Sequence, residues 1–251
     1  MHAVILSAGR GQRLMPYTAA QPKCLVSVLG KPIVQWQIDL LLDHGIEQVA
    51  VVVGYGAEQV AEVLHARYGD RVTCVFNPFF RLCDNLISAW VARPFLQGDC
   101  LLLNGDTLMD HGALEAVLTG REGPVVLAVH RKPVYDDDDM KVQLQDERLL
   151  HVGKRLPDPI DAESIGCLRF DATGSRWFSD MLDEAVHDET AFGQWYLAVI
   201  ERMAGQHPVW VQDIGQNQWA ELDCPADLAH LREALPRWEL QGQGVALRDA
   251  E

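Results

Sequence analysis

The sequence predicts a single α/β domain whose central sheet is mainly parallel. Short apolar runs typical of buried strands alternate with segments in which apolar residues recur at helical spacing. This alternation predicts right-handed βαβ units and a sheet covered on both faces. The chain has 251 residues, of which 48% are hydrophobic and 23% charged, so it can bury a large core and has the composition of a soluble globular protein.

Each predicted element follows from one of these patterns. The first strands are expected at residues 3–6, 48–53, 72–76, 100–103, 125–129 and 164–170. Helices are expected at residues 33–44, 57–68, 85–92, 114–118, 177–184, 194–203 and 225–234, the last with Pro225 at its first position. A further strand is expected at 208–213. Short charged segments from 132 to 156 predict a hairpin-like excursion that closes over a substrate pocket. The domain is therefore expected to span residues 1–240, with a small β-rich excursion at about 131–160 and a tail at 241–251.

Composition excludes several classes of protein. The formal net charge of −15 disfavours nucleic acid and anionic membranes as partners, because binding to either needs excess Lys and Arg. No apolar run approaches the ~20 residues of a membrane span, and the first residues do not form a secretion signal, so we expect a cytoplasmic protein. The six cysteines are scattered singly, which favours reduced and packed thiols. Any phosphate ligand must then be held by a local positive cluster, helped by metal ions.

Such a cluster follows the first predicted strand. The strand ends at Leu6 and leads into a loop that contains Gly9 and Gly11. Backbone N–H groups in a glycine-containing loop after a strand are accessible to anions. Arg10, Arg13 and Lys23 add the positive charge that a polyphosphate needs, although an ordinary strand, turn and helix with surface charges is the alternative. The segment contains neither the P-loop motif nor the dinucleotide-binding motif, and it predicts a nucleoside triphosphate site of another kind.

The segment resembles the signature of the sugar-phosphate nucleotidylyltransferases, roughly G-x-G-x-R-L-x-P-x-T followed by P-K-x-L. Residues 9–18 read GRGQRLMPYT, residues 22–25 read PKCL and residues 30–33 read GKPI. The resemblance implies a Rossmann-like nucleotidyltransferase fold. The residues that it implies in nucleotide binding are Leu6, Ala8, Gly9, Gly11, Gly54, Asn85, Ser88 and Gly105.

Two aspartates are candidates to bind Mg²⁺. Asp106 emerges at the end of the strand at 100–103, beside Gly105, and Asp223 stands just before the helix that starts at Pro225. Mg²⁺ usually takes one or two carboxylates plus substrate phosphates. In the resembled family, the aspartate of the G-D motif and the second acid of the E-x-D motif have this role, and these two residues match those positions. A turn or helix-cap aspartate is the alternative for each.

The resemblance also implies the reaction. A phosphate oxygen of an acceptor attacks the α-phosphorus of a nucleoside triphosphate and pyrophosphate leaves, so catalysis consists of alignment and charge neutralisation. Arg13 is expected to hold the β- and γ-phosphates and Lys23 to neutralise the α-phosphate. Lys154 matches the lysine of the family's E-K-P motif, which grips the acceptor phosphate, but Gly153 replaces the acid and an arginine the proline. Lys141 competes for that role, and either lysine could simply be solvated.

Residues 77–88 point to a branch within the family. The step from Asn85 to Ser88 offers an amide that can donate and accept at a helix start, which suits the edge of a pyrimidine. Residues 77–88 lack the glutamine and glycine-rich turn typical of sugar-specific members and look more like the bacterial choline-phosphate cytidylyltransferases. An N-cap role is the alternative for Asn85.

The aspartates at 136–139 bear on the acceptor. Four adjacent carboxylates usually form a solvated loop, but over an acceptor pocket they would favour a cationic head group, with an aromatic ring face for an amine. Trp195, Tyr196 and Trp219 can supply that ring or can be core residues. The candidate acceptor-binding residues are Asp139, Lys141, Glu163, Trp195 and Trp219.

The sequence thus predicts a Mg²⁺-dependent cytidylyltransferase that couples CTP to a small phosphorylated alcohol, amine or phosphonate. One alternative is a sugar-1-phosphate uridylyl- or thymidylyltransferase. Another is a non-catalytic relative that binds nucleotide sugars, which the joint presence of Arg13, Lys23, Asp106 and Asp223 disfavours. A homodimer is possible, and neither the acceptor nor the oligomeric state follows from the sequence.

Overall fold

A mixed sheet of nine strands organises the chain. The computed structural model describes residues 1–246, with side chains described to residue 238. Within them the strands follow the order β5-β4-β1-β6-β11-β8-β12-β10-β9. The first four are mutually parallel: β5 (Val72–Phe76), β4 (Gln48–Val53), β1 (His2–Ser7) and β6 (Cys100–Asn104). This half of the sheet confirms the α/β class that the alternating pattern predicts.

The second half of the sheet is not uniformly parallel. β11 (Ala162–Phe170) runs antiparallel to both of its long neighbours, β6 and β8 (Val125–His130), whereas β12 (Val209–Asp213) is parallel to β8. Parallel neighbours need a crossover connection, usually a helix. The chain instead passes from β8 to β11 through the excursion, so β11 enters in the opposite direction.

The predicted excursion forms the far edge of the sheet. β9 (Lys141–Gln145) and β10 (Arg148–Gly153) make an antiparallel hairpin, and β9 also pairs with the start of β11. The two residues of the turn, Asp146 and Glu147, have φ angles of 51° and 62°, as a two-residue hairpin turn of type I′ requires. The hairpin therefore extends the sheet and carries the acidic run beside it.

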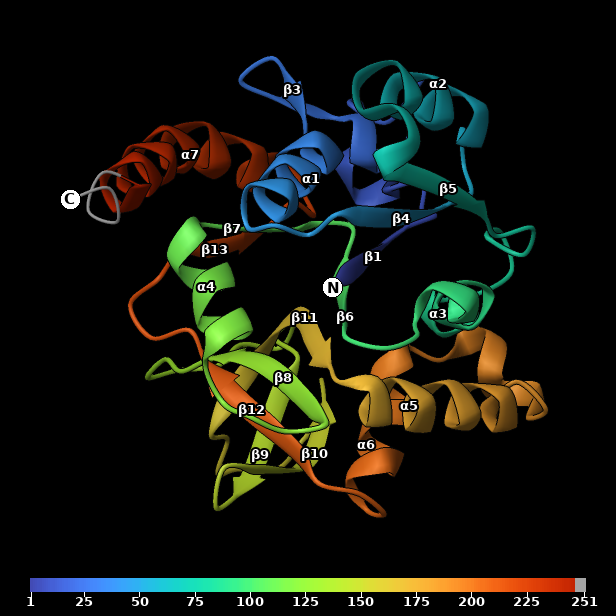
Figure 1. Cartoon of the computed structure of the whole chain (residues 1–251), viewed down its shortest axis with the longest axis vertical. Helices are drawn as coiled ribbons and strands as arrows, with labels where there is room; N and C mark the ends of the chain where they lie inside the picture. Colours follow the sequence, from blue (N-terminus) through green and yellow to red (C-terminus); the bar gives the residue numbers. More distant parts are fainter. Residues whose placement is uncertain (247–251) are drawn as a thin grey trace.

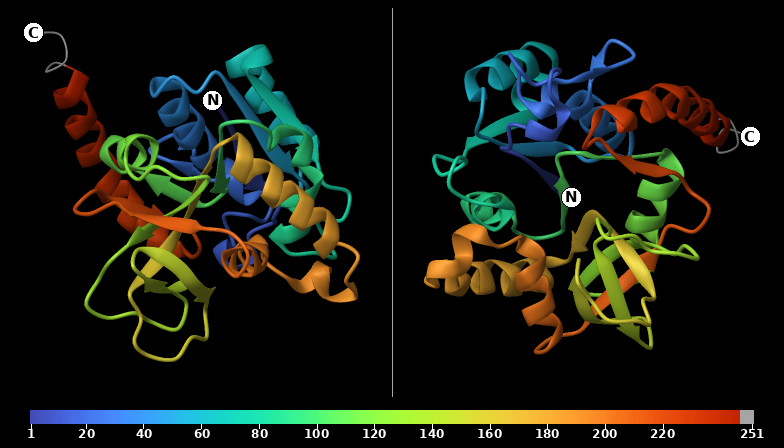
Figure 2. Two further views of the ribbon diagram at one scale, coloured as in Figure 1. Left: turned by 60° about the horizontal axis from the view of Figure 1, so that its bottom comes forward. Right: turned by 180° about the vertical axis from the view of Figure 1, so that it is seen from behind.

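Helices cover both faces of the sheet, as Figures 1 and 2 show. α1 (Ile33–Asp43), α2 (Ala57–Tyr68) and α4 (His111–Thr119) pack with alternate strand residues such as Ala3 and Ile5. α3 (Asn85–Val91), α5 (Ala172–Ala185) and α6 (Tyr196–Ala204) pack with their neighbours Val4 and Leu6. The period of two along β1 thus divides the core into two layers.

Capping side chains set several helix starts earlier than apolar spacing predicts. Asp110 accepts the N–H of Ala113, so α4 begins at His111. Asp171 accepts the N–H groups of Thr173 and Gly174, so α5 begins at Ala172 rather than at residue 177. A capping carboxylate satisfies N–H groups that the first turn leaves unpaired, and it is compatible with a polar first turn.

The last helix and a small two-stranded sheet complete the domain. α7 (Pro225–Ala246) extends past residue 240, where the tail was expected, and residues 247–251 of that tail lie outside the described residues. Leu228, Leu231 and Leu235 of α7 join a third apolar cluster with Leu14. β7 (Thr107–Met109) pairs antiparallel with β13 (Trp219–Glu221), and β2 (Ser27–Val28) with β3 (Lys31–Pro32). The β7–β13 pair brings the segment after Asp106 beside the segment before Asp223.

Two further expectations concern cysteines and membranes. All six cysteines are free, and burial raises the pKa of Cys24, Cys100 and Cys167 to about 12, as packed thiols require. Among residues 1–246, no helix is both long and apolar enough to cross a bilayer.

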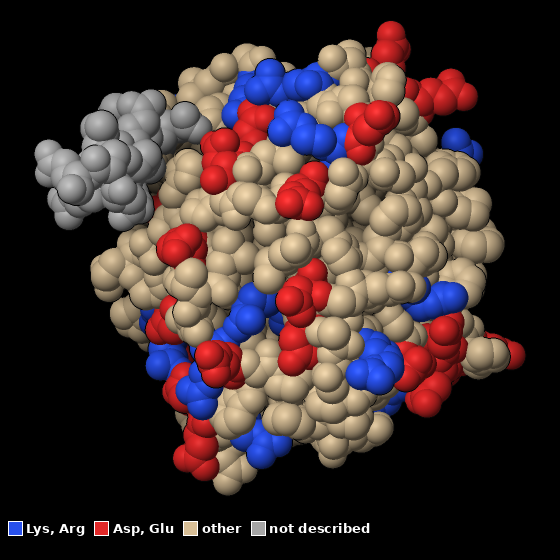
Figure 3. Space-filling model, viewed as in Figure 1, with Lys and Arg blue, Asp and Glu red and all other residues tan. Residues whose placement is uncertain are grey.

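On the face drawn in Figure 3, Lys and Arg side chains lie close to Asp and Glu side chains. Positive side chains on that face therefore form no broad basic surface, which agrees with the net charge of −15.

The aromatic contacts beneath α5 predict a stability effect. Phe178 is fully buried and stacks on Phe170 with ring centroids 5.1 Å apart. Phe178→Ala should lower the free energy of unfolding by about 3–5 kcal/mol, because it removes buried apolar surface and leaves a cavity. Urea unfolding measures the loss, with Val134→Ala as the control because Val134 is 77% exposed. Equal midpoints for the two variants would contradict this packing.

Candidate functional site

Three cavities meet at the carboxyl ends of β1 and β6, where an α/β sheet places its ligands. The loop cavity, of about 420 Å³, is lined by Leu6, Gly9, Gly11, Arg13, Lys23 and Gly105, among others. The hairpin cavity, of about 520 Å³, extends from there to Asp139, Lys154, Glu163, Trp195 and Trp219. A smaller Asn85 cavity, of about 210 Å³, borders Ala8, Asn85 and Ser88. Arg13, Asp106 and Asp223 line both larger cavities and mark their junction.

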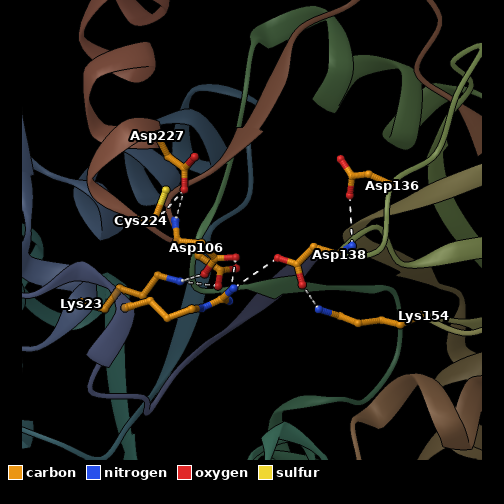
Figure 4. Close-up of polar contacts among 9 residues, drawn as sticks. Lys23, Asp106, Asp136, Asp138, Lys154, Cys224 and Asp227 are labelled. Atoms are coloured by element: carbon orange, nitrogen blue, oxygen red, sulfur yellow. Dashed lines mark hydrogen bonds and ion pairs between the residues drawn. The ribbon is translucent and has the colours of Figure 1, made fainter.

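A cluster of ion pairs occupies this junction. The Lys23 ammonium lies 2.7 Å from Asp106 Oδ2 and 2.6 Å from Asp223 Oδ1. Arg13 lies 3.0 Å from Asp223 Oδ2 and 3.2 Å from Asp138 Oδ2. Figure 4 shows the Lys23 ammonium directed at Asp106, and Asp138 lying beside the cluster with one oxygen directed at Lys154. The two predicted metal ligands thus come together, and two predicted phosphate-binding cations contact them.

Local sequence explains how Lys23 reaches this position. Gly11 has a φ of 75°, and a Cβ on it would lie 2.7 Å from the Lys23 Cβ. The fully buried Thr18 donates its hydroxyl to the Gly11 carbonyl at 2.7 Å, which closes the loop. Burial alone would lower the pKa of Lys23, but the charges of Asp106 and Asp223 outweigh it and the pKa is raised. The side chain of Lys23 is therefore charged, and the two aspartates fix the position of its ammonium group.

The turn that carries Asp106 is tightly fitted against β1. A Cβ on Gly105 would overlap the Ser7 hydroxyl and the Leu6 carbonyl, so a side chain cannot be accommodated there without movement. The Gly105 N–H donates to the Leu6 carbonyl at 3.0 Å. Asp106 Oδ1 is buried without a hydrogen-bond partner among the described residues. A buried carboxylate oxygen with no donor is a ready ligand for a cation.

The turn that carries Asp223 is held by the first turn of α7. Asp227 Oδ2 accepts the N–H groups of Asp223 and Cys224, both at 2.7 Å. The contact to Cys224 is one of the two hydrogen bonds of a capping box, in which the side chain of the third helical residue accepts the backbone N–H of the residue before the helix. The backbone of Asp223 is therefore fixed by the same interaction that starts α7.

These residues fit a Mg²⁺ ion. Within the described residues no group of three or more His, Cys, Asp or Glu side chains has metal-binding geometry, so a cage made only of protein ligands is not formed. Mg²⁺ is usually bound by one or two carboxylates together with substrate phosphates. Burial, followed by the charges of Asp106 and Asp223, raises the pKa of the adjacent Glu221 to about 8. Asp106 and Asp223, with the Oδ1 of Asp106 that has no partner among the described residues, are the carboxylates that would hold such an ion.

Lys154, and not Lys141, lines the hairpin cavity. Lys154 pairs with Asp138 Oδ1, and its ammonium lies 5.4 Å from the ring centroid of Trp195. Lys141 is 8% exposed, is not among the described residues lining the cavity, and donates to the backbone carbonyls of Asp136 and Lys154. Lys141 thus ties the excursion together, while Lys154 faces the space.

The aspartate run is only partly solvated. Asp136, Asp138 and Asp139 line the hairpin cavity. Asp138 forms ion pairs with both Arg13 and Lys154, and the sequence alone does not predict this bridge. Asp139 shares the Lys132 ammonium with the buried Glu163, at 2.8 Å in each case. Four neighbouring acids in the sequence therefore have different surroundings, and the spacing of the motif carries no signal for these long-range partners.

The residues expected to select the base have structural contacts of their own. Asp84, not Asn85, is the N-cap residue of α3, so the N-cap alternative for Asn85 is wrong. The Asn85 side-chain oxygen accepts the N–H of Tyr196 at 2.9 Å and so fixes the start of α6. The buried Ser88 hydroxyl accepts from Asn77 at 3.0 Å. Gly54 is not among the described residues lining the three cavities and is pressed against Ala8 and Phe80.

Three comparisons describe what the chain resembles. Residues 2–123 match the family model described as nucleotidyl transferase. A CMP-5′-(3-aminopropyl)phosphonate synthase of Streptomyces rubellomurinus is 30% identical over 90% of this chain, which spans only 37% of that protein. A choline-phosphate cytidylyltransferase of Streptococcus pneumoniae is 29% identical over 94% of this chain and 98% of that protein. The inositol-1-phosphate CTP transferase from T. maritima has the same fold, with a TM-score of 0.81 over 95% of this chain and 96% of the other, at 23% identity.

The ion cluster predicts how stability responds to Mg²⁺. In Lys23→Met, the carboxylates of Asp106 and Asp223 face each other without their shared cation, which should cost about 3 kcal/mol. A divalent ion bound between them should restore much of this loss, since a ligand that binds only the folded state stabilises it. Thermal unfolding in Mg²⁺ and in EDTA measures the difference between the two conditions. We expect a larger difference for Lys23→Met than for the wild type.

The matched control is Lys31→Met, because Lys31 pairs with Asp39 at 2.7 Å and does not line the loop or hairpin cavity among the described residues. Its response to Mg²⁺ should equal that of the wild type. An equal response in Lys23→Met would show that Asp106 and Asp223 do not bind the ion together.

Proposed function

We propose that this chain, whose residues 2–123 match the nucleotidyl transferase family model, transfers a cytidylyl group from CTP to a small phosphorylated alcohol, amine or phosphonate and releases pyrophosphate. The observation that carries the proposal is the junction at Arg13, Asp106 and Asp223, which line both the loop cavity and the hairpin cavity. A triphosphate in the first and an acceptor in the second would meet at these residues. The activities for which the relatives are named support CTP as the donor.

The proposed reaction needs no side-chain nucleophile. An oxygen of the acceptor phosphate or phosphonate forms a bond to the α-phosphorus of CTP, and the bond from that phosphorus to the pyrophosphate oxygen breaks. The side chains align the two reactants and neutralise developing charge. Lys23 would donate to the α-phosphate, and Arg13 with the N–H groups of the loop at Gly9 and Gly11 would hold the β- and γ-phosphates.

Asp106 and Asp223 would hold the metal ion, and Lys23 pairs with both carboxylates. When bound there, Mg²⁺ would supply additional charge neutralisation for the phosphates. The ion cluster therefore already brings the candidate metal ligands and the proposed α-phosphate cation together at one point.

The hairpin cavity is lined by two kinds of group. Arg13 and Lys154 provide cations, where an acceptor phosphate would bind. Asp139 and Glu163, and the indole rings of Trp195 and Trp219, also line the space. Acidic groups with aromatic faces suit an ammonium group. This arrangement supports an acceptor with a phosphate or phosphonate at one end and an amine at the other.

On the nucleotide side, the Asn85 cavity is the proposed base pocket. Because the side-chain oxygen of Asn85 accepts from Tyr196, the amide nitrogen is the group that this side chain offers to a base. A donor suits the ring nitrogen or carbonyl of a pyrimidine. This supports a pyrimidine nucleotide, while the preference for CTP over UTP rests on the relatives.

Pyrophosphate release tests the proposal directly. CTP, UTP, dTTP and ATP are each paired with choline phosphate, 2-aminoethylphosphonate, inositol phosphate and glucose 1-phosphate. We expect release with CTP and an amine-bearing acceptor. Release with UTP or dTTP and glucose 1-phosphate would support a sugar nucleotidylyltransferase instead, and no release with any pair would support a nucleotide-binding protein without this activity.

The metal ligands should be needed for turnover. Asp106→Asn or Asp223→Asn should each lower kcat by at least ~100-fold, in line with an electrostatic contribution of about 3 kcal/mol. Circular dichroism should show a retained fold. Asp43→Asn is the control, because Asp43 does not line the loop or hairpin cavity among the described residues. Undiminished kcat in Asp106→Asn or Asp223→Asn would refute the assignment.

Lys154 should act on acceptor binding. Lys154→Ala removes the cation next to Trp195 and should raise the acceptor KM about tenfold with a smaller change in kcat, whereas Lys23→Ala should mainly lower kcat. Arg93→Ala is the control for loss of a positive charge. Arg93 pairs with Asp183 at 3.0 Å and is not among the described residues that line the three cavities. An unchanged acceptor KM in Lys154→Ala would show that another group holds the acceptor phosphate.

The acidic run should favour an amine-bearing acceptor. Asp139→Asn removes a cavity carboxylate and leaves the Lys132 ammonium with less counter-charge, so kcat/KM should fall more for 2-aminoethylphosphonate than for a neutral phosphorylated alcohol. Higher salt should narrow the difference. Asp137→Asn is a matched control, since Asp137 is not among the described residues that line the cavity. Equal losses for both acceptors would contradict a cationic subsite at Asp139.

A further inference from the structure

Gln37 holds the turn that carries Asp106, and among the described residues it does not line the loop, hairpin or Asn85 cavity. It lies in α1 and is 3% exposed. Its Nε2 donates to the carbonyl of Asn104 and to the carbonyl of Thr107, at 2.8 Å in each case. These two carbonyls bracket the dipeptide Gly105–Asp106. Both N–H bonds of one amide group are therefore used on the two sides of a candidate metal ligand.

The chemistry of this clamp requires an uncharged double donor. Two carbonyl oxygens that converge on one point repel each other unless donors lie between them, and a primary amide supplies two N–H groups without a charge. Reversing the amide would place its oxygen against both carbonyls, so the network fixes its orientation. Gln37 Oε1 is left buried and without a partner among the described residues, which is a cost that the clamp has to offset.

The clamp also sets the position of Asp106 relative to Asp223. The Asp106 carbonyl accepts the N–H of Leu222 at 3.0 Å, and Thr107 pairs with Glu221 in the β7–β13 ladder. A shift in the Asn104–Thr107 turn would therefore change the distance between the two carboxylates. Gln37 contacts the turn from α1, so it restrains the turn from the side that the ladder does not reach.

We propose that Gln37 is a positioning residue for Asp106, which keeps the two carboxylates at the separation that a divalent ion needs. This inference rests on the proposed function for the part that concerns turnover. Residues that orient metal ligands commonly change metal affinity or activity by about 10- to 100-fold when substituted. Because Gln37 is not among the described residues that line the three cavities, it would act on the site through the Asp106 turn.

Gln37→Leu tests the proposal, because it keeps the bulk of the side chain and removes both donors. Binding of Mn²⁺ to the protein alone, followed by the electron paramagnetic resonance of the free ion, should weaken about tenfold. In the pyrophosphate assay, kcat should fall about 10- to 100-fold and the metal concentration for half-maximal rate should rise, with little change in the KM for the acceptor.

Two controls separate positioning from stability. Gln35→Leu makes the same chemical change on the same helix, at a half-buried residue, and should leave Mn²⁺ binding and kcat unchanged. Ile38→Ala removes a fully buried side chain of α1, so it should lower the unfolding temperature without weakening Mn²⁺ binding. If Gln37→Leu behaves like Ile38→Ala, with lower stability and unchanged Mn²⁺ binding and kcat, the proposal is wrong.

The Mn²⁺ measurement keeps this inference distinct from the proposed function. Weakened Mn²⁺ binding in Gln37→Leu, in a protein that releases no pyrophosphate with any substrate pair, would support the positioning of Asp106 and refute the transferase activity. Pyrophosphate release by the wild type together with unchanged Mn²⁺ binding in Gln37→Leu would support the transferase activity and refute the positioning of Asp106 by Gln37.

Discussion

The ammonium of Lys23 between Asp106 and Asp223 is the interaction on which the rest of the site depends. It joins residues separated by 83 and by 200 positions in the sequence. The loop after β1, the turn after β6 and the segment before α7 all meet at this ammonium. Each of these backbones is independently constrained, by Gly11 and Thr18, by Gly105, and by Asp227 respectively. The site is therefore assembled from three rigid turns rather than from one motif.

Electrostatics explains why a chain with a net charge of −15 can present a phosphate site at all. Lys23, Arg13 and Lys154 are gathered around one junction, and each is paired with an aspartate. Interactions between nearby charges in a partly desolvated cavity are much stronger than those with distant surface charges. The local arrangement consequently outweighs the overall charge.

Much of the fold and of the candidate site could be predicted from the sequence because the signals were local. The alternation of strand-like and helix-like spacing of apolar residues predicts the α/β class. Gly105 beside Asp106 at the end of a strand indicates a turn that faces a ligand. The direction of β11, the bridge at Asp138 and the clamp at Gln37 could not be predicted in this way. Each depends on a partner far away in the sequence, as in the 125 positions between Arg13 and Asp138. A glutamine on an apolar helix looks like any half-exposed polar residue until its carbonyl partners are known.

The β7–β13 ladder has a consequence for how the protein matures on the ribosome. Strand β7 and the Asp106 turn emerge early, together with Lys23 and the whole parallel half of the sheet. β13, Asp223 and the first turn of α7 follow more than a hundred residues later, because Asp106 lies 83 positions after Lys23 and Asp223 lies 200 positions after it. Until then, β7 has no pairing partner among the described residues and only one carboxylate of the pair has been synthesised. The ion site can therefore be completed only after the late segment docks.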